Sequence, residues 1–190
     1  MVTGKAVFID RDGVINREKE YLHRIEDFEF IDGVFDACRM FRDQGYRIVI
    51  VTNQSGIGRG YYSEQEYARL TEWMVAQFSG QGVAITDVFF CPHHPERAEG
   101  EYRLACDCRK PQPGMLLAAA QKHRIDLSRS LMFGDKEADI QAGHAAGVGK
   151  TVLVRSGHPI DESATAAEYI IDSLGELDAV QQILRRMDNV

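Results

Sequence analysis

The sequence predicts an α/β fold in which a parallel sheet carries helices on both faces. Short runs rich in valine, isoleucine and phenylalanine alternate with segments whose apolar residues recur every three or four positions. Such alternation is typical of parallel strands joined by helical crossovers. The chain has 190 residues and no visible repeat, low-complexity tract or linker, so we expect residues 1–190 to form one domain with a sizeable core.

The predicted strands are the short apolar runs, several of them rich in β-branched residues. They lie at residues 6–9, 47–51, 87–90, 131–133, 151–154 and 169–171. The predicted helices are recognised by their apolar stripes and their ends. The first runs from Val34 to Phe41 and ends at Gly45, and the second opens at Ser63 with Glu66 in capping-box position. Further helices are expected at 115–123, at 138–146 and at 177–187, the last capped by Ser173 and Glu176.

Three predicted strands end in polar side chains. The first runs into Asp10, Asp12 and Gly13, a later one into Thr52, and another into Asp135. A single end of this kind would be interpreted as an Asx turn. The carboxyl ends of parallel strands share one edge of the sheet, where ligands bind in open α/β folds, so the three ends together predict a functional site.

Two long loops are expected to leave the sheet at that same edge. They cover roughly residues 14–32 and 91–112, and loops longer than about 12 to 15 residues in compact domains are usually functional. Neither is long enough to form a separate cap domain.

The second loop contains a candidate metal site. Cys91, His93, Cys106 and Cys108 offer three thiolates and an imidazole, a ligand set that suits tetrahedral zinc. The alternatives are a disulfide, which rarely persists in a cytosolic protein, or reduced surface thiols. Four protein ligands would leave no position for water, so the zinc would be structural. His94 is a competing ligand.

Charge and hydropathy exclude several classes of function. The net charge of −7 disfavours general nucleic-acid binding, although a few local basic groups would suffice for a small phosphate ester. No segment approaches the roughly twenty apolar residues that span a membrane. Met1 to Lys5 lead directly into the first strand, which leaves no room for a signal peptide. We therefore expect a cytoplasmic protein. We also expect it to act as a monomer.

Several motifs together resemble a known superfamily. Asp10-x-Asp12-Gly13-Val14, Thr52 after a strand, Lys110 before a proline, and Gly134-Asp135 followed by Asp139 are similar to the four motifs of the haloacid dehalogenase superfamily. The runs 52–60, 91–95 and 106–111 resemble, more narrowly, its heptose-1,7-bisphosphate 7-phosphatase family. The similarity extends from about Lys5 to Arg155. It implies a Rossmann-like domain without a cap and with a zinc-stapled loop.

The resemblance also implies a mechanism. Asp10 would be the nucleophile that forms an aspartyl-phosphate, and Asp12 the general acid and then base. Magnesium would bind the Asp10 carboxylate, the Asp12 main-chain carbonyl and Asp135. Lys110, with Thr52 and Asn53, would hold the phosphoryl oxygens. The resemblance supports zinc at the four loop positions, and Asp139 would orient a metal-bound water or a basic side chain rather than bind the metal.

The implied substrate is a sugar bisphosphate that loses its 7-phosphate, in nucleotide-heptose biosynthesis for lipopolysaccharide core or a surface glycan. Arg109 and Arg59 are candidates for the second phosphate. Lys136 stands beside Asp135, which favours a phosphate or carboxylate contact. The further expected substrate contacts are Glu18, Lys19, Glu20, Tyr21, Asn53, Gln54 and Ser55. Many members of the family have a glycine where Glu20 stands. His158 and the other remaining histidines are expected to have surface or helix-end roles.

Two alternatives stay open. Histidinol-phosphate phosphatases share the zinc loop, although the run 56–60 looks more like the heptose enzymes. A phosphoacceptor receiver domain also uses aspartates, a threonine and a lysine. Receivers are shorter and lack a zinc loop, and an acid/base such as Asp12 would shorten the life of their phosphoaspartate.

Overall fold

The computed structural model describes residues 4–188, apart from the side chain of residue 188, and confirms the predicted α/β class. Residues 1–3, part of the segment in which we expect no signal peptide, lie outside the described range. Six strands form one parallel sheet in the order β3-β2-β1-β4-β5-β6. The strands are β1 (Lys5–Ile9), β2 (Tyr46–Asn53), β3 (Asp87–Cys91), β4 (Leu131–Gly134), β5 (Lys150–Val154) and β6 (Tyr169–Ile171).

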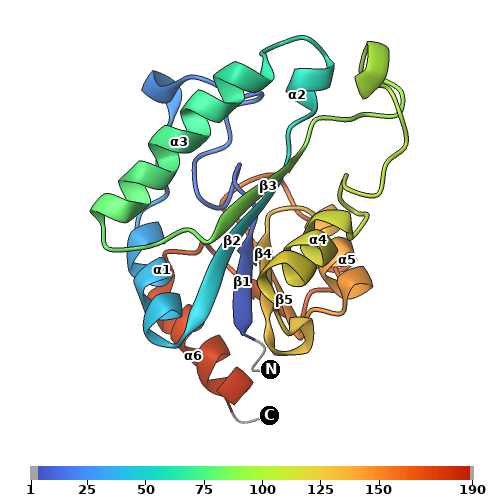
Figure 1. Ribbon diagram of the computed structural model, residues 1–190. Helices are drawn as coiled ribbons and strands as arrows, with labels where there is room; N and C mark the ends of the chain where they lie inside the picture. The colour runs from blue at the N-terminus through green and yellow to red at the C-terminus, as the bar shows by residue number, and fades with distance from the viewer. Residues whose placement is uncertain (1–3, 189–190) are drawn as a thin grey trace.

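Helices cover both faces of this sheet, as Figure 1 shows. The α-helices are α1 (Val34–Asp43), α2 (Ser55–Gly58), α3 (Glu64–Gly80), α4 (Gly114–His123), α5 (Glu137–Ala146) and α6 (Leu177–Asp188). Alternate strand residues face opposite ways. Val7 and Ile9 of β1 therefore pack in a core with α1, α3 and α6, while Ala6 and Phe8 pack in a second core with α4 and α5.

The local signals in the sequence account for several of these elements. The predicted stripe of α1 is buried in full, including Cys38. Ser63 and Glu66 form the predicted capping box: the Glu66 main-chain N–H donates to Ser63 Oγ, and the Ser63 N–H donates to Glu66 Oε2. Burial of such stripes, more than intrinsic propensity, is what holds short helices together in a protein.

Two details differ from the predictions. The four-residue helix α2 was not predicted, since its Ser-Gly-Ile-Gly sequence has no stripe to reveal it. The last helix begins at Leu177, and Ser173 does not cap it: Ser173 Oγ accepts from the Gly175 N–H in the preceding turn. The carboxylate of Glu176 accepts from the Asp172 N–H, which also lies before the helix.

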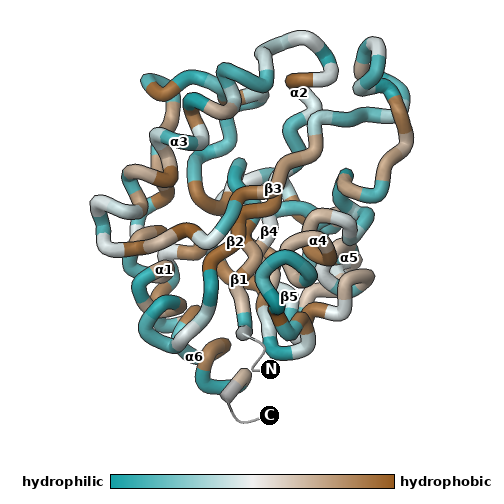
Figure 2. Tube along the Cα trace, in the orientation of Figure 1, coloured by the Kyte–Doolittle hydropathy of each residue, from teal (hydrophilic) through white to brown (hydrophobic). Residues whose placement is uncertain are grey.

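The strand register brings the predicted strand ends together. Ile9 of β1 lies between Ile50 of β2 and Phe133 of β4, and the Asp10 N–H donates to the Phe133 carbonyl at 3.0 Å. Asp10, Thr52 and Asp135 therefore stand at one edge of the sheet. Figure 2 shows hydrophobic strands at the centre and largely hydrophilic loops beyond this edge. Within residues 4–188, no helix is long and apolar enough to cross a membrane.

Candidate active site

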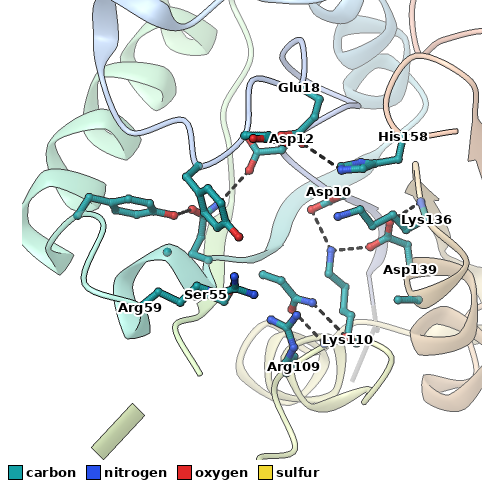
Figure 3. Close-up of a pocket in the computed structure, with 17 residues that line it drawn as sticks. Asp10, Asp12, Glu18, Ser55, Arg59, Arg109, Lys110, Lys136, Asp139 and His158 are labelled. Atoms are coloured by element: carbon teal, nitrogen blue, oxygen red, sulfur yellow. Dashed lines mark hydrogen bonds and ion pairs between the residues drawn. The ribbon is translucent and has the colours of Figure 1, made fainter. Parts of the chain in front are cut away.

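The carboxyl edge of the sheet opens into a cavity of about 480 Å³. Its walls come from the ends of β1 and β2, from the loop after β1, from α2 and the residues after it, from the residues before α4, from the start of α5 and from the loop after β5. Figure 3 shows the side chains that converge on it. Most of the residues predicted to contact magnesium or the substrate line this cavity, and the exceptions among them are Thr52, Lys19 and Asp135.

A buried lysine lies between two carboxylates at the base of the cavity. Lys110 Nζ is 2.9 Å from Asp10 Oδ1 and 2.6 Å from Asp139 Oδ1, and it donates to the Val51 carbonyl at 2.8 Å. Burial alone would lower the pKa of Lys110, but the charges of Asp10 and Asp139 outweigh it and raise that pKa. Burial raises the pKa of Asp10 to about 6, although Lys110 opposes the shift. Asp139 thus orients a basic side chain, one of the two roles expected of it.

Asp135 lies fully buried just behind the cavity wall, after β4. Its Oδ2 accepts from the His158 main-chain N–H at 3.0 Å and lies 2.6 Å from His158 Nδ1. Its Oδ1 is buried and has no hydrogen-bond partner among the described residues. Glycine is required beside it, because a Cβ on Gly13 or Gly157 would stand 2.3 or 2.1 Å from Asp135 Oδ2. Burial, and then the charge of Asp10, raises the pKa of Asp135.

These carboxylates fit a magnesium ion. One carboxylate oxygen each from Asp10, Asp135 and Asp139 lie within 4.8 Å of one another, and oxygen ligands are those that Mg²⁺ prefers. Asp139 is committed elsewhere: Oδ1 pairs with Lys110, and Oδ2 accepts from the N–H groups of Asp135 and Lys136. The unpartnered oxygen of Asp135 is the group that a cation would satisfy, so the pair of Asp10 and Asp135 fits magnesium best.

The side chain of Asp12 is surrounded by hydrogen-bond donors. Its carboxylate accepts from Arg11 Nη2 at 2.9 Å, from Asn16 Nδ2 at 3.0 Å and from Gln54 Nε2 at 3.1 Å. Arg11 is buried and also donates to the Leu22 carbonyl. Sequence reasoning missed Arg11, although its position between the two aspartates could have drawn attention to it. Three side chains therefore hold the Asp12 carboxylate in place at the cavity wall.

The last residues of β2 and the two residues that follow it support the site. Thr52 is buried, and its Oγ1 accepts from Gln54 Nε2 at 2.8 Å rather than facing the cavity. Asn53 holds the main chain of Lys110 on both sides: its Nδ2 donates to the Lys110 carbonyl, and its Oδ1 accepts from the Lys110 N–H, each at 3.0 Å. Gln54 and Ser55 line the cavity.

The loop after β1 forms one wall of the cavity. Glu18, Glu20 and Tyr21 line it, but Lys19 does not, because its ammonium donates to the Asp27 carbonyl and pairs with the carboxylate of Glu29. Glu20 and Tyr21 adopt positive φ angles of 29° and 56°, a conformation that glycine adopts more easily. Burial raises the pKa of Glu18, with the charge of Asp12 as a second cause.

Three basic side chains border the cavity. Arg59 lies with its Cζ 5.5 Å from the centre of the Tyr21 ring, and Arg109 Nη1 donates to the His93 carbonyl at 3.4 Å. Lys136 lies at the start of α5. Burial lowers the pKa of Arg109, and the neighbouring charge of Arg59 lowers it further. The cavity therefore offers positive charge away from the buried Lys110.

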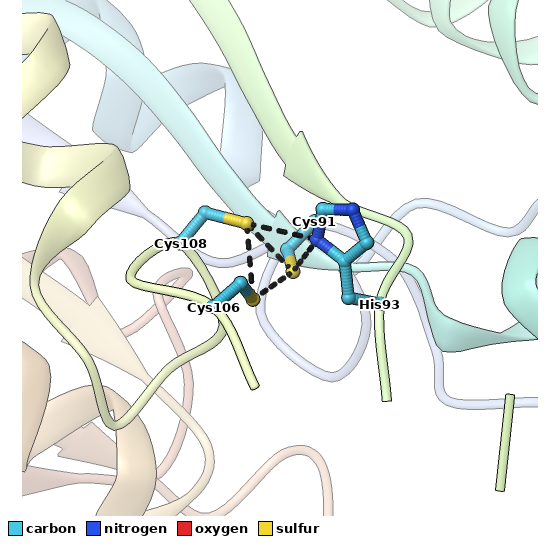
Figure 4. A group of neighbouring side chains, drawn as sticks. All are labelled: Cys91, His93, Cys106 and Cys108. Carbon is cyan, nitrogen blue, oxygen red and sulfur yellow. Dashed lines mark hydrogen bonds between the residues drawn. The ribbon is translucent and has the colours of Figure 1, made fainter. Parts of the chain in front are cut away.

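The four predicted zinc ligands converge in the second loop, as Figure 4 shows. The sulfur atoms of Cys91, Cys106 and Cys108 are 2.9 to 3.5 Å apart, and His93 Nδ1 is 3.4 Å from Cys108 Sγ. Ligands bound to zinc at about 2.3 Å would be roughly 3.8 Å apart, somewhat farther than these atoms are, and the four side chains are gathered so that they could hold a tetrahedral ion. All four cysteines of the protein are free thiols, and no disulfide joins them. His94 is outside the cluster, where its Nδ1 accepts from the N–H groups of Glu96 and Arg97.

One further cavity residue escaped the sequence analysis. His158 was expected at the surface, but it lines the cavity between Asp135 and Glu18, with Nε2 3.9 Å from Glu18 Oε2. The available signal was its place just after β5, since that strand ends at the same edge as β1, β2 and β4.

Comparisons with known proteins identify relatives of this chain that are phosphatases. Residues 107–177 match a family model described as "HAD-hyrolase-like". A D-glycero-β-D-manno-heptose-1,7-bisphosphate 7-phosphatase from Photorhabdus laumondii subsp. laumondii is 50% identical over 173 residues, which cover 90% of this chain and 92% of that protein. The chain belongs to this family. The enzyme of the same name from Escherichia coli K12 is 49% identical, with coverage of 90% and 91%.

A solved structure of the family has the same fold. The D,D-heptose 1,7-bisphosphate phosphatase of B. bronchiseptica, crystallised with magnesium and phosphate, superimposes with a TM-score of 0.79. It is 26% identical, and the match covers 96% of this chain and 99% of that one. Membership of this phosphatase family confirms the expectation of a phosphoric monoester hydrolase and excludes the receiver domain.

Proposed function

We propose that the protein hydrolyses the 7-phosphate of D-glycero-β-D-manno-heptose 1,7-bisphosphate through a phosphorylated Asp10. The observation that carries this proposal is the buried group of Asp10, Lys110 and Asp139 beside Asp135, at the base of a cavity bordered by arginines. The names of the related enzymes supply the substrate and its β anomer.

In the first half-reaction, an oxygen of the Asp10 carboxylate attacks phosphorus, and the bond from phosphorus to the sugar oxygen breaks. Protonated Asp12 gives its proton to that oxygen as the sugar departs. In the second, Asp12 takes a proton from the water that attacks the phosphoaspartate, and phosphate leaves with Asp10 restored. A covalent intermediate divides one difficult displacement into two easier ones.

Lys110 and a magnesium ion would provide the electrostatic stabilisation. The Lys110 ammonium lies 2.9 Å from the nucleophile, where it can offset the repulsion between Asp10 and the phosphate dianion. Magnesium, held by Asp10 and Asp135 and by the Asp12 main-chain carbonyl, would supply further charge neutralisation at the phosphoryl oxygens. Asn53 would act mainly by fixing the main chain of Lys110.

We further propose that zinc is bound by Cys91, His93, Cys106 and Cys108, and that its role is structural. Arg109 and Lys110 directly follow the last of these ligands. The loop has little hydrophobic core, so a metal would replace the missing packing. Held in this way, Arg109, with Arg59 near it, would contact the phosphate that stays on the sugar. We also propose that the enzyme acts as a monomer.

The test is turnover of purified protein on the β and α heptose 1,7-bisphosphates, the matching monophosphate and histidinol phosphate, with mass spectrometry of the quenched enzyme. We expect the β bisphosphate to have the highest kcat/KM and to leave a phosphate on Asp10. Preference for histidinol phosphate would contradict the substrate assignment, and absence of label on Asp10 with an active enzyme would contradict the mechanism. Sedimentation velocity would test the oligomeric state.

A further inference from the structure

The loop after β5 contributes a side chain whose position the proposed chemistry does not yet use. His158 lies within this loop and is half-buried, with 34% of its side chain exposed. Its main-chain N–H and its ring Nδ1 both meet the same oxygen of Asp135, Oδ2, at 3.0 and 2.6 Å. On the other side of the ring, Nε2 faces the carboxylate of Glu18 at 3.9 Å.

These contacts make the two oxygens of Asp135 unequal. Oδ2 has two partners from His158, whereas Oδ1 is buried and has none among the described residues. A buried carboxylate oxygen without a partner costs free energy, and a cation would remove that cost. Gly13 and Gly157 pack directly against Oδ2, so the carboxylate is closely enclosed on the side of His158.

We propose that His158 is a positioning residue for magnesium, and that it acts by fixing Asp135. The ring N–H holds Oδ2 and leaves Oδ1 as the oxygen that would bind the ion. Partners of this kind, one contact removed from a metal, typically change metal affinity by 10- to 100-fold. The inference rests on the magnesium site of the proposed function, and it extends that function to a residue of the loop after β5.

According to this proposal, magnesium affinity depends on where the side chain at position 158 places its hydrogen-bond donor. Substitutions can remove this donor or move it. His158→Leu removes both ring nitrogens and keeps the main-chain N–H. His158→Asn places an amide N–H near the position of Nδ1, so it can still donate to Asp135. His158→Gln extends an amide toward the position of Nε2 and Glu18. A matched control is His144→Leu, since the side chain of His144 has a similar exposed fraction, 36%, but contacts Thr151 and Glu168 away from the cavity.

The experiment is calorimetric titration of each magnesium-free, zinc-loaded protein with MgCl2 in the absence of substrate, with circular dichroism to confirm folding. We expect the Mg²⁺ dissociation constant to rise about tenfold in His158→Leu and His158→Gln, and to stay within about threefold of wild type in His158→Asn and His144→Leu. In steady-state kinetics, the magnesium needed for half-maximal rate should rise in parallel. The KM for the sugar phosphate at saturating magnesium should change little.

Two results would overturn the inference. One is wild-type magnesium affinity in His158→Leu, and the other is an equal loss in His158→Asn and His158→Gln, which would mean that the donor position does not matter. If His158→Leu fails to fold, the comparison of the two amide variants still decides. A wild-type protein that binds no Mg²⁺ at millimolar concentration would instead overturn the metal site of the proposed function.

Discussion

The two candidate metal sites of this protein are built in opposite ways. The ligands of the oxygen site, Asp10 and Asp135, follow different strands and meet because the sheet register brings them together. The ligands of the sulfur site span only residues 91–108, and three of the four lie in a loop with little core of its own. We expect the sheet to keep its shape without magnesium, and we propose that the loop needs zinc to be ordered. Lys110 joins the two regions, because its main chain follows the sulfur site and its ammonium lies in the oxygen site.

The strongest way to test the oxygen site is to remove its nucleophile. Asp10→Asn should lower kcat at least about a thousandfold, because an amide cannot attack phosphorus, while the melting temperature changes little. Stopped assays with β-heptose 1,7-bisphosphate would measure it. The matched control is Asp87→Asn, which makes the same carboxyl-to-amide change at the first residue of β3, at the edge of the sheet away from the cavity. An Asp10→Asn enzyme with a tenth of wild-type turnover would exclude Asp10 as nucleophile.

The residue that joins the two sites should have the next largest effect. Lys110→Ala should lower kcat about 10²- to 10³-fold for bisphosphate and monophosphate alike, because the ammonium acts at the reacting phosphoryl group. It also leaves Asp10 and Asp139 without the cation between them, which should raise the pKa of Asp10 further and destabilise the fold at neutral pH. Parallel kinetics and thermal melts would show both effects. A loss confined to the bisphosphate would place Lys110 at the second phosphate instead.

Removing a thiol tests the claim that the sulfur site is structural. Cys106→Ser and Cys108→Ser should lose the zinc ion, because each removes one of its thiolate ligands. Structural zinc contributes about 10 kcal/mol to folding of such loops, so the loop should also lose its order. Metal analysis and hydrogen exchange should show zinc loss and faster exchange in residues 91–112, with β1 and β4 unaffected. Activity should fall because Arg109 and Lys110 are no longer held. Cys38→Ala, in the α1 core, should keep its zinc. Zinc-free protein with full activity and an ordered loop would show that the cysteines are incidental.

The smallest expected effect separates binding from chemistry. Arg109→Ala should raise the KM for the bisphosphate about tenfold and leave kcat nearly unchanged, because a charge-assisted hydrogen bond is worth about 1.5 to 3 kcal/mol. The matching monophosphate has no second dianion, so its kinetics should not change. Arg97→Ala, an arginine of the same loop that does not line the cavity, is the control. Equal penalties on both substrates would assign Arg109 to the reaction itself.

The strands, the longer helices and the edge at which the site lies could be predicted from the sequence alone. Short continuous apolar runs mark the strands, and apolar stripes mark the helices, because both patterns are local in the chain. The polar residues Asp10, Thr52 and Asp135 at strand ends then indicated a site, because parallel strands present their ends at one edge. The loop cysteines also revealed themselves through local clustering and ligand chemistry.

The tertiary structure alone decided how these residues meet. Lys110 and Asp10 are 100 positions apart, and no local pattern shows that the ammonium would also pair with Asp139. No local pattern shows the hydrogen bonds between the Asn53 side chain and the Lys110 main chain, or the contact between His158 and Asp135. Nor could the sequence show that Lys19 turns to Asp27 while Glu18 faces the cavity, because neighbouring loop residues point in directions set by the packing around them. Side-chain direction in loops has no period, so only the folded chain fixes it.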